Sequence, residues 1–158
     1  MSELLSAAEG RLGRVVVLRL KPGDDLLDGL QAACERFGIH NGVILSGIGS
    51  LGCVRFCDVE ALPEKKCGYG YGRILALDDT IELTGASGVI CSDEENRINL
   101  HVHICLSDKT GKAYGGHLVQ GTKVLMTADF VLGEIEGIDM RREYDPETDV
   151  YLLSPRQK

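Results

Sequence analysis

The chain has 158 residues, of which 44% are hydrophobic and 26% charged, and these proportions favour one globular domain over a disordered or membrane-spanning chain. Its 17 Lys and Arg residues against 24 Asp and Glu residues give a formal net charge of -7, which argues against nucleic acid as the default partner. The N-terminal residues lack a basic segment followed by an apolar one, so we expect no signal peptide and a cytoplasmic protein.

The first predicted elements are a strand and the only strongly periodic helix. Residues 12–20 are rich in Val and Leu, which is typical of a strand. Residues 24–37 place their apolar side chains along one stripe at the 3.6-residue period of a helix. Asp24 or Asp25 can cap the start of this helix, and Gly38 can end it. The pattern predicts an amphipathic helix that covers a sheet.

The rest of the chain to about residue 137 has strand character, interrupted by turns that contain Gly, Asp or Asn. The predicted strands cover residues 42–49, 51–60, 72–77, 79–85, 86–92, 97–107, 114–121 and 123–137. We therefore expect an α+β fold, in which one main helix packs on a largely antiparallel, strongly bent sheet within residues 1–140. Residues 141–158 contain two prolines and scattered charges, and are expected to form a mobile tail or an arm on a neighbouring subunit.

Two features of the sequence, a glycine pattern and the cysteines, do not predict the binding sites with which they are often associated. Gly47 to Gly52 match the G-x-G-x-x-G pattern, but the residues that follow have strand character, whereas a dinucleotide site needs a helix there. A glycine-lined strand turn or bulge is the simpler interpretation. The six cysteines form no C-x-x-C motif, so we expect reduced, mostly buried thiols and no zinc ribbon.

The most informative segment is residues 97–106, in which apolar and polar residues alternate strictly. The alternation places the apolar side chains on the core side of a strand and both His101 and His103 on the opposite face. At roughly 3.4 Å of rise per residue, the backbone positions of His101 and His103 lie about 6.8 Å apart along the strand, and their imidazoles can converge on one metal ion.

The third ligand is expected from the next strand. After a turn at residues 107–112, the strand would return antiparallel and bring His117 toward His101 and His103. Gly115 and Gly116 would allow the close backbone approach that this requires. Three neutral imidazoles leave a position for water or substrate, as catalytic metal sites do. The alternative is that all three are ordinary polar or core histidines.

Two further side chains are candidates for chemistry beside a metal. Glu82 lies between apolar residues on a predicted strand and could act as a general base, or it could be a solvated strand residue. Arg55 could hold an anion or pair with an acid. Residues 68–73, which alternate Gly and Tyr, could form a lid over a pocket, a nucleic-acid stacking loop or a plain surface loop.

Taken together, these motifs resemble the PPC (also written PCC) domain, which is known from plant AT-hook nuclear proteins and from stand-alone bacterial and archaeal proteins. The resemblance extends over residues 12–137 and rests on L-x-P-G-x-D-L, V-I-L-S-G-I-G-S-L, I-E-L-T-G, L-H-V-H-I-C-L-S-D, G-K-A-Y-G-G-H-L and T-A-D-F-V-L. It implies an α+β sheet with one prominent helix, a homotrimer, and a zinc-like metal held by His101, His103 and His117 near a subunit interface.

The resemblance leaves three functions open. The first is a metal site that binds, and in an enzymatic version converts, a small polar or anionic molecule, as a metal-dependent hydrolase or lyase would. The second is DNA binding, although the R-G-R-P core of the plant AT-hook is absent and Lys65-Lys66 and Arg141-Arg142 are the only adjacent basic pairs. The third is a structural trimeric scaffold whose histidines bind nothing.

Overall fold

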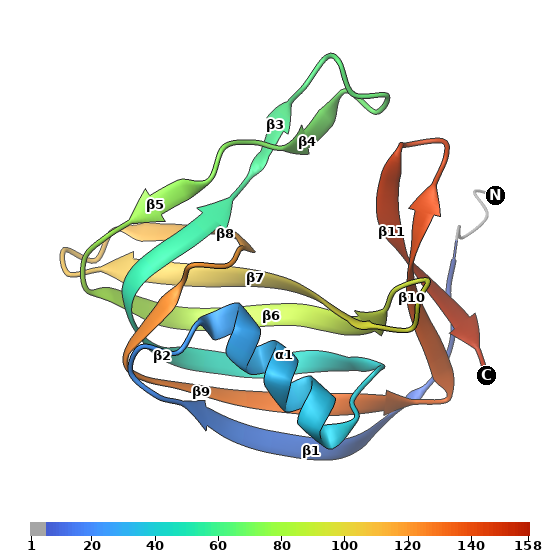
Figure 1. Ribbon diagram of the computed structural model, residues 1–158, viewed down its shortest axis with the longest axis horizontal. Coiled ribbons are helices and arrows are strands. Elements are labelled where there is room, and N and C mark those ends of the chain that lie inside the picture. The colour runs from blue at the N-terminus through green and yellow to red at the C-terminus, as the bar shows by residue number, and fades with distance from the viewer. Residues whose placement is uncertain (1–5) are drawn as a thin grey trace.

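The computed structural model describes residues 6–158 and consists mainly of one bent sheet with a single helix lying across it (Figure 1). The elements in chain order are β1 (Arg11–Leu20), α1 (Leu26–Phe37), β2 (Gly42–Cys57), β3 (Val59–Ala61), β4 (Tyr69–Tyr71), β5 (Leu75–Leu77), β6 (Ile81–Ser92), β7 (Ile98–Asp108), β8 (Ala113–Leu118), β9 (Lys123–Glu136), β10 (Ile138–Asp145) and β11 (Val150–Gln157).

Nine strands form the main sheet in the order β1-β9-β2-β8-β7-β6-β10-β11, with β5 paired to β2, and β3 pairs with β4 in a separate ribbon. The long strand β2 bends the sheet, because its first part pairs with β6 and β9 and its last residues pair with β8 and β5. Its register against β9 shifts three times between Ile44 and Cys53, which confirms the bulges predicted for the glycine-rich stretch. At Gly47 a Cβ would collide with the ring of Phe130, so a larger residue would displace the core.

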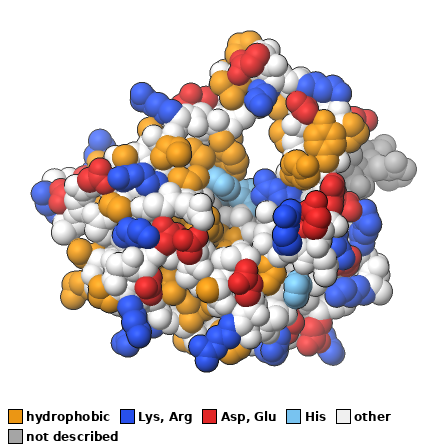
Figure 2. Space-filling view, viewed as in Figure 1, with side chains coloured by type: hydrophobic (Ala, Val, Ile, Leu, Met, Phe, Trp, Pro, Cys, Tyr) orange, Lys and Arg blue, Asp and Glu red, His pale blue; other side chains and the backbone are white. Residues whose placement is uncertain are grey.

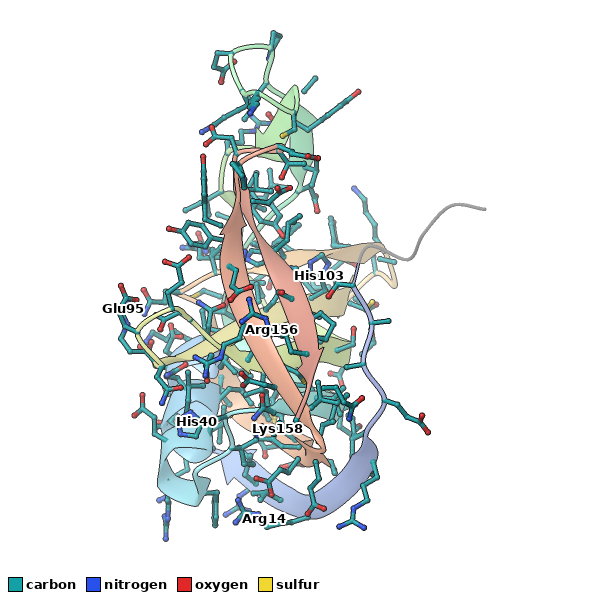
Figure 3. All side chains as sticks on the ribbon, turned by 90° about the vertical axis from the view of Figure 1, so that its right-hand side faces the viewer. Arg14, His40, Glu95, His103, Arg156 and Lys158 are labelled. Atoms are coloured by element: carbon teal, nitrogen blue, oxygen red, sulfur yellow. The ribbon has the colours of Figure 1, made fainter. Side chains whose placement is uncertain are left out.

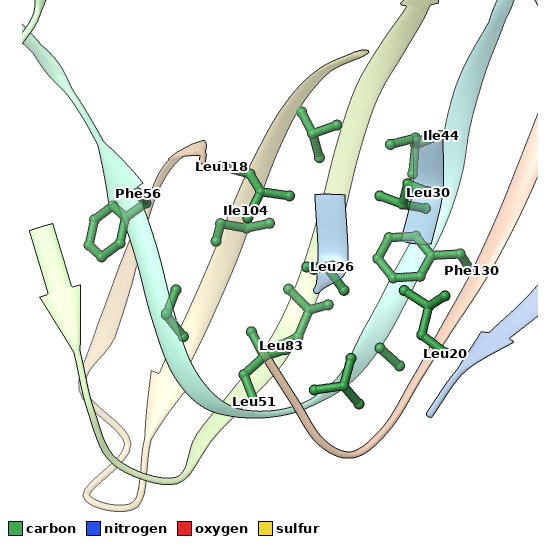
Figure 4. Close-up of a cluster of buried hydrophobic side chains, with 14 of the residues drawn as sticks. Leu20, Leu26, Leu30, Ile44, Leu51, Phe56, Leu83, Ile104, Leu118 and Phe130 are labelled. Atoms are coloured by element: carbon green, nitrogen blue, oxygen red, sulfur yellow. The ribbon is translucent and has the colours of Figure 1, made fainter. Parts of the chain in front are cut away.

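The hydrophobic core lies between α1 and the inner face of the sheet (Figure 4). Leu26 and Leu30 of α1 are fully buried, and they share the cluster with Ile44 of β2 and Phe130 of β9. Burying each of these leucines contributes about 1.5–3 kcal/mol. The helix is therefore fixed against one face of the sheet. The opposite face and the edges of the sheet are not covered by this helix.

The α+β class expected from the sequence is wrong. Strands account for 62% of the residues and helix for 8%, so the fold is mostly β. The expected class gave the helix too much weight, because β10 and β11 form further strands where a tail was expected. Several strands were also predicted too short: the stretches 42–49 and 51–60 belong largely to β2, and 79–85 and 86–92 to β6.

Two hairpins project from the same side of the main sheet (Figure 1). One is the β3–β4 ribbon, which includes Tyr69–Tyr71. The other is the β10–β11 hairpin, which joins the sheet by a parallel pairing of Arg141 with Ser92 and carries Arg156 on its outer strand (Figure 3). Residues 141–158, expected as a tail or arm, thus form most of a regular hairpin, and its docking on a neighbouring subunit stays a prediction. None of the helices in residues 6–158 has the length and apolar character needed to cross a membrane.

Candidate metal centre

The predicted alternation of β7 is confirmed. Val102, Ile104 and Leu106 are each 1% exposed and face the core, whereas His101 and His103 lie on the opposite face. Strand β6 supports this strand along its whole length, with Val89 opposite His101 and Ser87 opposite His103. Two imidazoles therefore stand side by side on a strand whose backbone is held between β6 and β8.

The return of β8 beside β7 is confirmed as well, and it places His117 directly opposite His103. The two strands are joined by a tight turn at residues 109–112, so their register is fixed locally. At Gly116 a Cβ would lie 2.9 Å from the carbonyl oxygen of Cys57, and this close approach lets β8 fit between β7 and the end of β2.

The three histidines converge on one point in space. Their potential ligand nitrogens all lie within 4.8 Å of one another, and the Nε2 atoms of His101 and His103 are 3.1 Å apart. The ring centroids are 5.0 Å apart for His101 and His117 and 5.5 Å for His103 and His117. Two ligands bound tetrahedrally at about 2.0–2.1 Å each would have a similar nitrogen separation.

The donor set fits a transition metal. The Nδ1 atom of His117 is buried and has no hydrogen-bond partner among the described residues. Burial lowers the pKa of His117 to about 4, with further contributions from His101, His103 and Arg142. Burial, followed by Arg142 and His103, also lowers the pKa of His101. Both imidazoles are thus neutral at pH 7, which is the form that binds metals.

Tyr71 of β4 covers the histidines from the side of the β3–β4 ribbon. Its ring stacks on that of His117, with centroids 4.3 Å apart and planes inclined by 26°. Its hydroxyl oxygen lies 3.2 Å from Nε2 of His101. Burial is the main cause that raises the pKa of this phenol, so the hydroxyl keeps its proton at neutral pH.

A pocket of about 940 Å³ opens above the histidines, between the β3–β4 ribbon and the β10–β11 hairpin. Figure 2 shows histidine side chains at the bottom of this hollow, with a basic side chain beside them. At the tips of the two hairpins, Nζ of Lys66 donates to the carbonyl oxygen of Pro146. The lining residues are Val59, Tyr69, Gly70, Tyr71, Asp93, Glu94, Glu95, Arg97, Asn99, Leu100, His101, His117, Arg142, Val150, Tyr151 and Leu152.

The structure does not bring the other two predicted site residues to this pocket. Glu82 is exposed on β6 opposite Ser107, and it is not among the residues that line the pocket. Arg55 forms an ion pair with Asp78, in which Nη1 and Oδ1 are 2.7 Å apart, and it also lies outside the pocket lining. Their catalytic roles stay predictions, and any such role would require contacts other than those seen here.

Three polar residues that line the pocket with His101 and His117, namely Arg142, Asn99 and Tyr71, were not among the predicted site residues. Arg142 and Asn99 face the pocket, and the guanidinium of Arg142 lies 3.4 Å from the side-chain oxygen of Asn99. The alternation of residues 97–106 could have predicted Asn99 as a pocket residue, because Asn99 lies on the same face of β7 as His101 and His103. No sequence pattern could have predicted Arg142, since its position depends on how the β10–β11 hairpin docks. Tyr71 lies in the segment for which a lid was one of the alternatives.

The comparisons with known proteins agree with this architecture. Residues 7–136 match the sequence model of the Plants and Prokaryotes Conserved (PCC) domain. The chain belongs to this family. A curated relative, the bifunctional protein GlmU of Synechococcus sp. (strain JA-3-3Ab), is 30% identical to this PCC-domain protein over 135 residues. The match covers 85% of this chain but only 19% of the relative, so the chain spans about a fifth of that protein's length.

Solved structures show the same fold. A protein from Archaeoglobus fulgidus described as metal-containing has a TM-score of 0.80 and 26% identity to the PCC-domain protein, over 94% of this chain and 99% of that one. A protein from Bacteroides thetaiotaomicron, provisionally named as DNA-binding, has a TM-score of 0.73 and 20% identity, over 92% and 96% of the two chains. The second likeness shows the fold alone.

Proposed function

We propose that the PCC-domain protein holds a divalent transition metal, with zinc the best fit, at His101, His103 and His117, and that it binds a small polar or anionic molecule in the pocket above. The observation that carries the proposal is the convergence of the ring nitrogens of His101, His103 and His117 within 4.8 Å, with His101 and His117 lining a pocket of about 940 Å³. The metal content described for the Archaeoglobus relative supports it.

The roles of the residues follow from their contacts. The three imidazoles would hold the metal, and a metal with three histidine ligands can polarise a bound oxygen or lower the pKa of a bound water. Tyr71 covers His117 with its ring and contacts His101 with its hydroxyl, so it shields the ligands from bulk water. A hydrolase or lyase is the enzymatic form of this proposal, and a binding protein is the simpler form.

Elemental analysis of the purified protein tests the metal site. We expect about one transition-metal ion per chain after reconstitution, and nearly none in the His101→Ala/His103→Ala double variant. His40→Ala is the matched control, because His40 is exposed, contacts Ser92 and takes no part in the cluster. A native protein that takes up no transition metal after reconstitution would refute the proposal.

Self-association as a homotrimer is part of the same proposal. Large apolar side chains are exposed on the neighbouring strands β1, β9 and β2, and Val17 and Met126 are 75% and 71% exposed. Strand β1 is also an unpaired edge of the main sheet, and oligomers often cover such edges. Sedimentation equilibrium should give a mass three times that of the 17.1 kDa chain. A 17.1 kDa species at micromolar concentration would exclude the trimer.

DNA binding is the second candidate, and the provisional name of the Bacteroides structure is the observation that favours it. The charge of the chain opposes it, since 24 acidic residues outnumber 17 basic ones. Of the two basic pairs, Arg141 is also engaged by Asp139. Retardation of a duplex at low salt, weakening steeply as salt rises, would support DNA binding, and no retardation at low salt would exclude it.

A further inference from the structure

The pocket contains two arginines in different electrostatic situations. Arg97 is neutralised, because its guanidinium pairs with Asp93 at 2.8 Å and with Glu95 at 2.7 Å. Arg142 forms no ion pair with a carboxylate of residues 6–158, and its side-chain partner there is the neutral amide of Asn99. Partial burial of a guanidinium without a counter-ion costs free energy, and a bound anion would offset this cost.

Arg142 faces the metal centre. Burial is the main cause that lowers the pKa of His101 and His117, and the positive charge of Arg142 contributes to both shifts. With His101 and His117, Arg142 lines the same pocket. A ligand that places one end over the histidines therefore has a positive charge within reach of another of its groups.

The remaining walls restrict what this ligand can be. Apolar and aromatic residues line the pocket from both hairpins, with Tyr71 on β4 and Val150, Tyr151 and Leu152 on β11. The rim carries Glu94, whose carboxylate pairs with no cation among the described residues. Without a bound metal, a single available guanidinium and an acidic rim favour a monoanion over a dianion or a polyanion, because extra negative charge would be repelled. A divalent metal at the histidines would add positive charge, so this preference is tested on the metal-free protein.

We propose that Arg142 is the anion-binding residue of this pocket and that its ligand is a small organic carboxylate with an apolar body. The carboxylate contacts Arg142, the apolar body lies against Val150 and Leu152 of β11, and the remaining polar end is directed toward the three histidines. This assignment rests on the proposed metal site for the position of that polar end, but not for the contact with Arg142.

Titration of the metal-free full chain with benzoate, followed by amide chemical shifts of the isotope-labelled protein, tests the assignment, because phosphate could otherwise bind the proposed metal and not Arg142. Benzoate supplies a carboxylate on an apolar ring, and benzamide is its neutral counterpart. We expect saturable shifts in residues 97–101 and 150–152, with benzamide binding at least about tenfold more weakly because it lacks the charge. Inorganic phosphate should compete no better than benzamide.

Variants separate this proposal from the metal proposal. Arg142→Gln should weaken benzoate binding about tenfold or more, and Arg142→Lys should restore part of it. Arg156→Gln should leave it nearly unchanged, because Arg156 lies on the same hairpin but pairs with Glu143 and does not line the pocket. Urea midpoints show whether each variant is folded. Benzoate binding that persists in the His101→Ala/His103→Ala variant would support the carboxylate contact even if the metal site fails.

Three results would overturn the assignment. They are equal affinity for benzoate and benzamide, unchanged benzoate binding by a folded Arg142→Gln variant, and tighter binding of phosphate than of benzoate. Metal content measured on the same Arg142→Gln sample after reconstitution should equal that of the native protein, so a failure of the metal site is visible separately.

Discussion

The hydroxyl oxygen of Tyr71 lies 3.2 Å from Nε2 of His101, although the two residues come from a short ribbon and from the centre of the main sheet. The same tyrosine stacks on His117, so one side chain contacts two of the three proposed ligands. The ribbon is thereby tied to the histidines by both a polar and an aromatic contact.

Removing this cover should speed metal loss. In Tyr71→Ala, both the stacking on His117 and the contact with His101 disappear, and supporting groups around metal ligands typically change affinity about 10–100-fold. We expect zinc release to a chromogenic chelator to become about tenfold faster, with Tyr71→Phe between this variant and the native protein. Equal release rates in all three proteins would show that Tyr71 does not protect the site.

Gly88 of β6 makes the close approach that positions the histidine strand. A Cβ at this position would collide with the carbonyl oxygen of His101 and lie 3.0 Å from Cα of Val102, and both are backbone atoms that cannot move aside cheaply. Gly88→Ala should lower the free energy of unfolding by about 1–3 kcal/mol and reduce metal uptake.

Gly85→Ala is the control for this change, because it lies on the same strand and its Cβ would meet only Cys105, at 4.0 Å. Urea unfolding monitored by circular dichroism should place the Gly85→Ala midpoint close to that of the native protein. If Gly88→Ala and Gly85→Ala had the same urea midpoint, the collision at Gly88 would not explain any loss of stability.

Asp108 stabilises the turn between β7 and β8 and should make stability depend on pH. A hydrogen bond from Thr110 is the largest cause that lowers the pKa of Asp108 to about 2, and Oδ1 also accepts from the backbone N–H of Thr110 and Lys112. Because the folded pKa is below the unfolded one, its stabilisation is complete above about pH 4 and is lost as the pH falls toward 2.

The Asp108→Asn variant checks this window. Its urea midpoint should fall below that of the native protein at pH 7, and the difference should shrink between pH 4 and pH 2. Asp145 is a useful comparison, because hydrogen bonds from Thr148 and Glu147 also lower its pKa but it belongs to the other hairpin. A difference that stays constant from pH 7 to pH 2 would contradict the role of the charge.

The free thiols should differ sharply in reactivity. Cys34 is buried in α1, and burial raises its pKa to about 11, whereas Cys105 is exposed on the histidine face of β7. At pH 8 an aromatic disulfide reagent should modify Cys105 in a fast phase that Cys105→Ser abolishes, and Cys34 only as the protein unfolds. Rapid modification of Cys34 in the native protein would mean that the helix opens locally.

Features that depend on neighbours in the sequence were predicted well. Asp25 caps α1 by accepting from the N–H groups of Leu27 and Asp28, and Gly38 ends the helix at a φ of 64°, so two local signals set both boundaries. The face of His101 and His103 follows from the period of a strand, and the position of His117 from a short turn. The prediction of mostly buried cysteines was only partly right, since three of the six are buried.

Features that depend on distant segments were not predictable in the same way. Tyr71 and Arg142 reach the histidines through pairings that no period or spacing encodes, and the strands that carry them lie in segments expected as a loop and a tail. The α+β class was wrong for a related reason, because β10 and β11 add strands to a segment that was expected as a tail.

The continuous segment from β7 to β8 has a consequence for the order in which the site can form. All three histidines lie within residues 101–117, joined by one tight turn, so bringing them together costs little loop-closure entropy. Tyr71 and Arg142 arrive only when two remote hairpins dock. If the proposed metal binds, a nascent chain could therefore capture it before its pocket exists. Changes in the β10–β11 hairpin could then alter what the pocket accepts while leaving the three histidines in place.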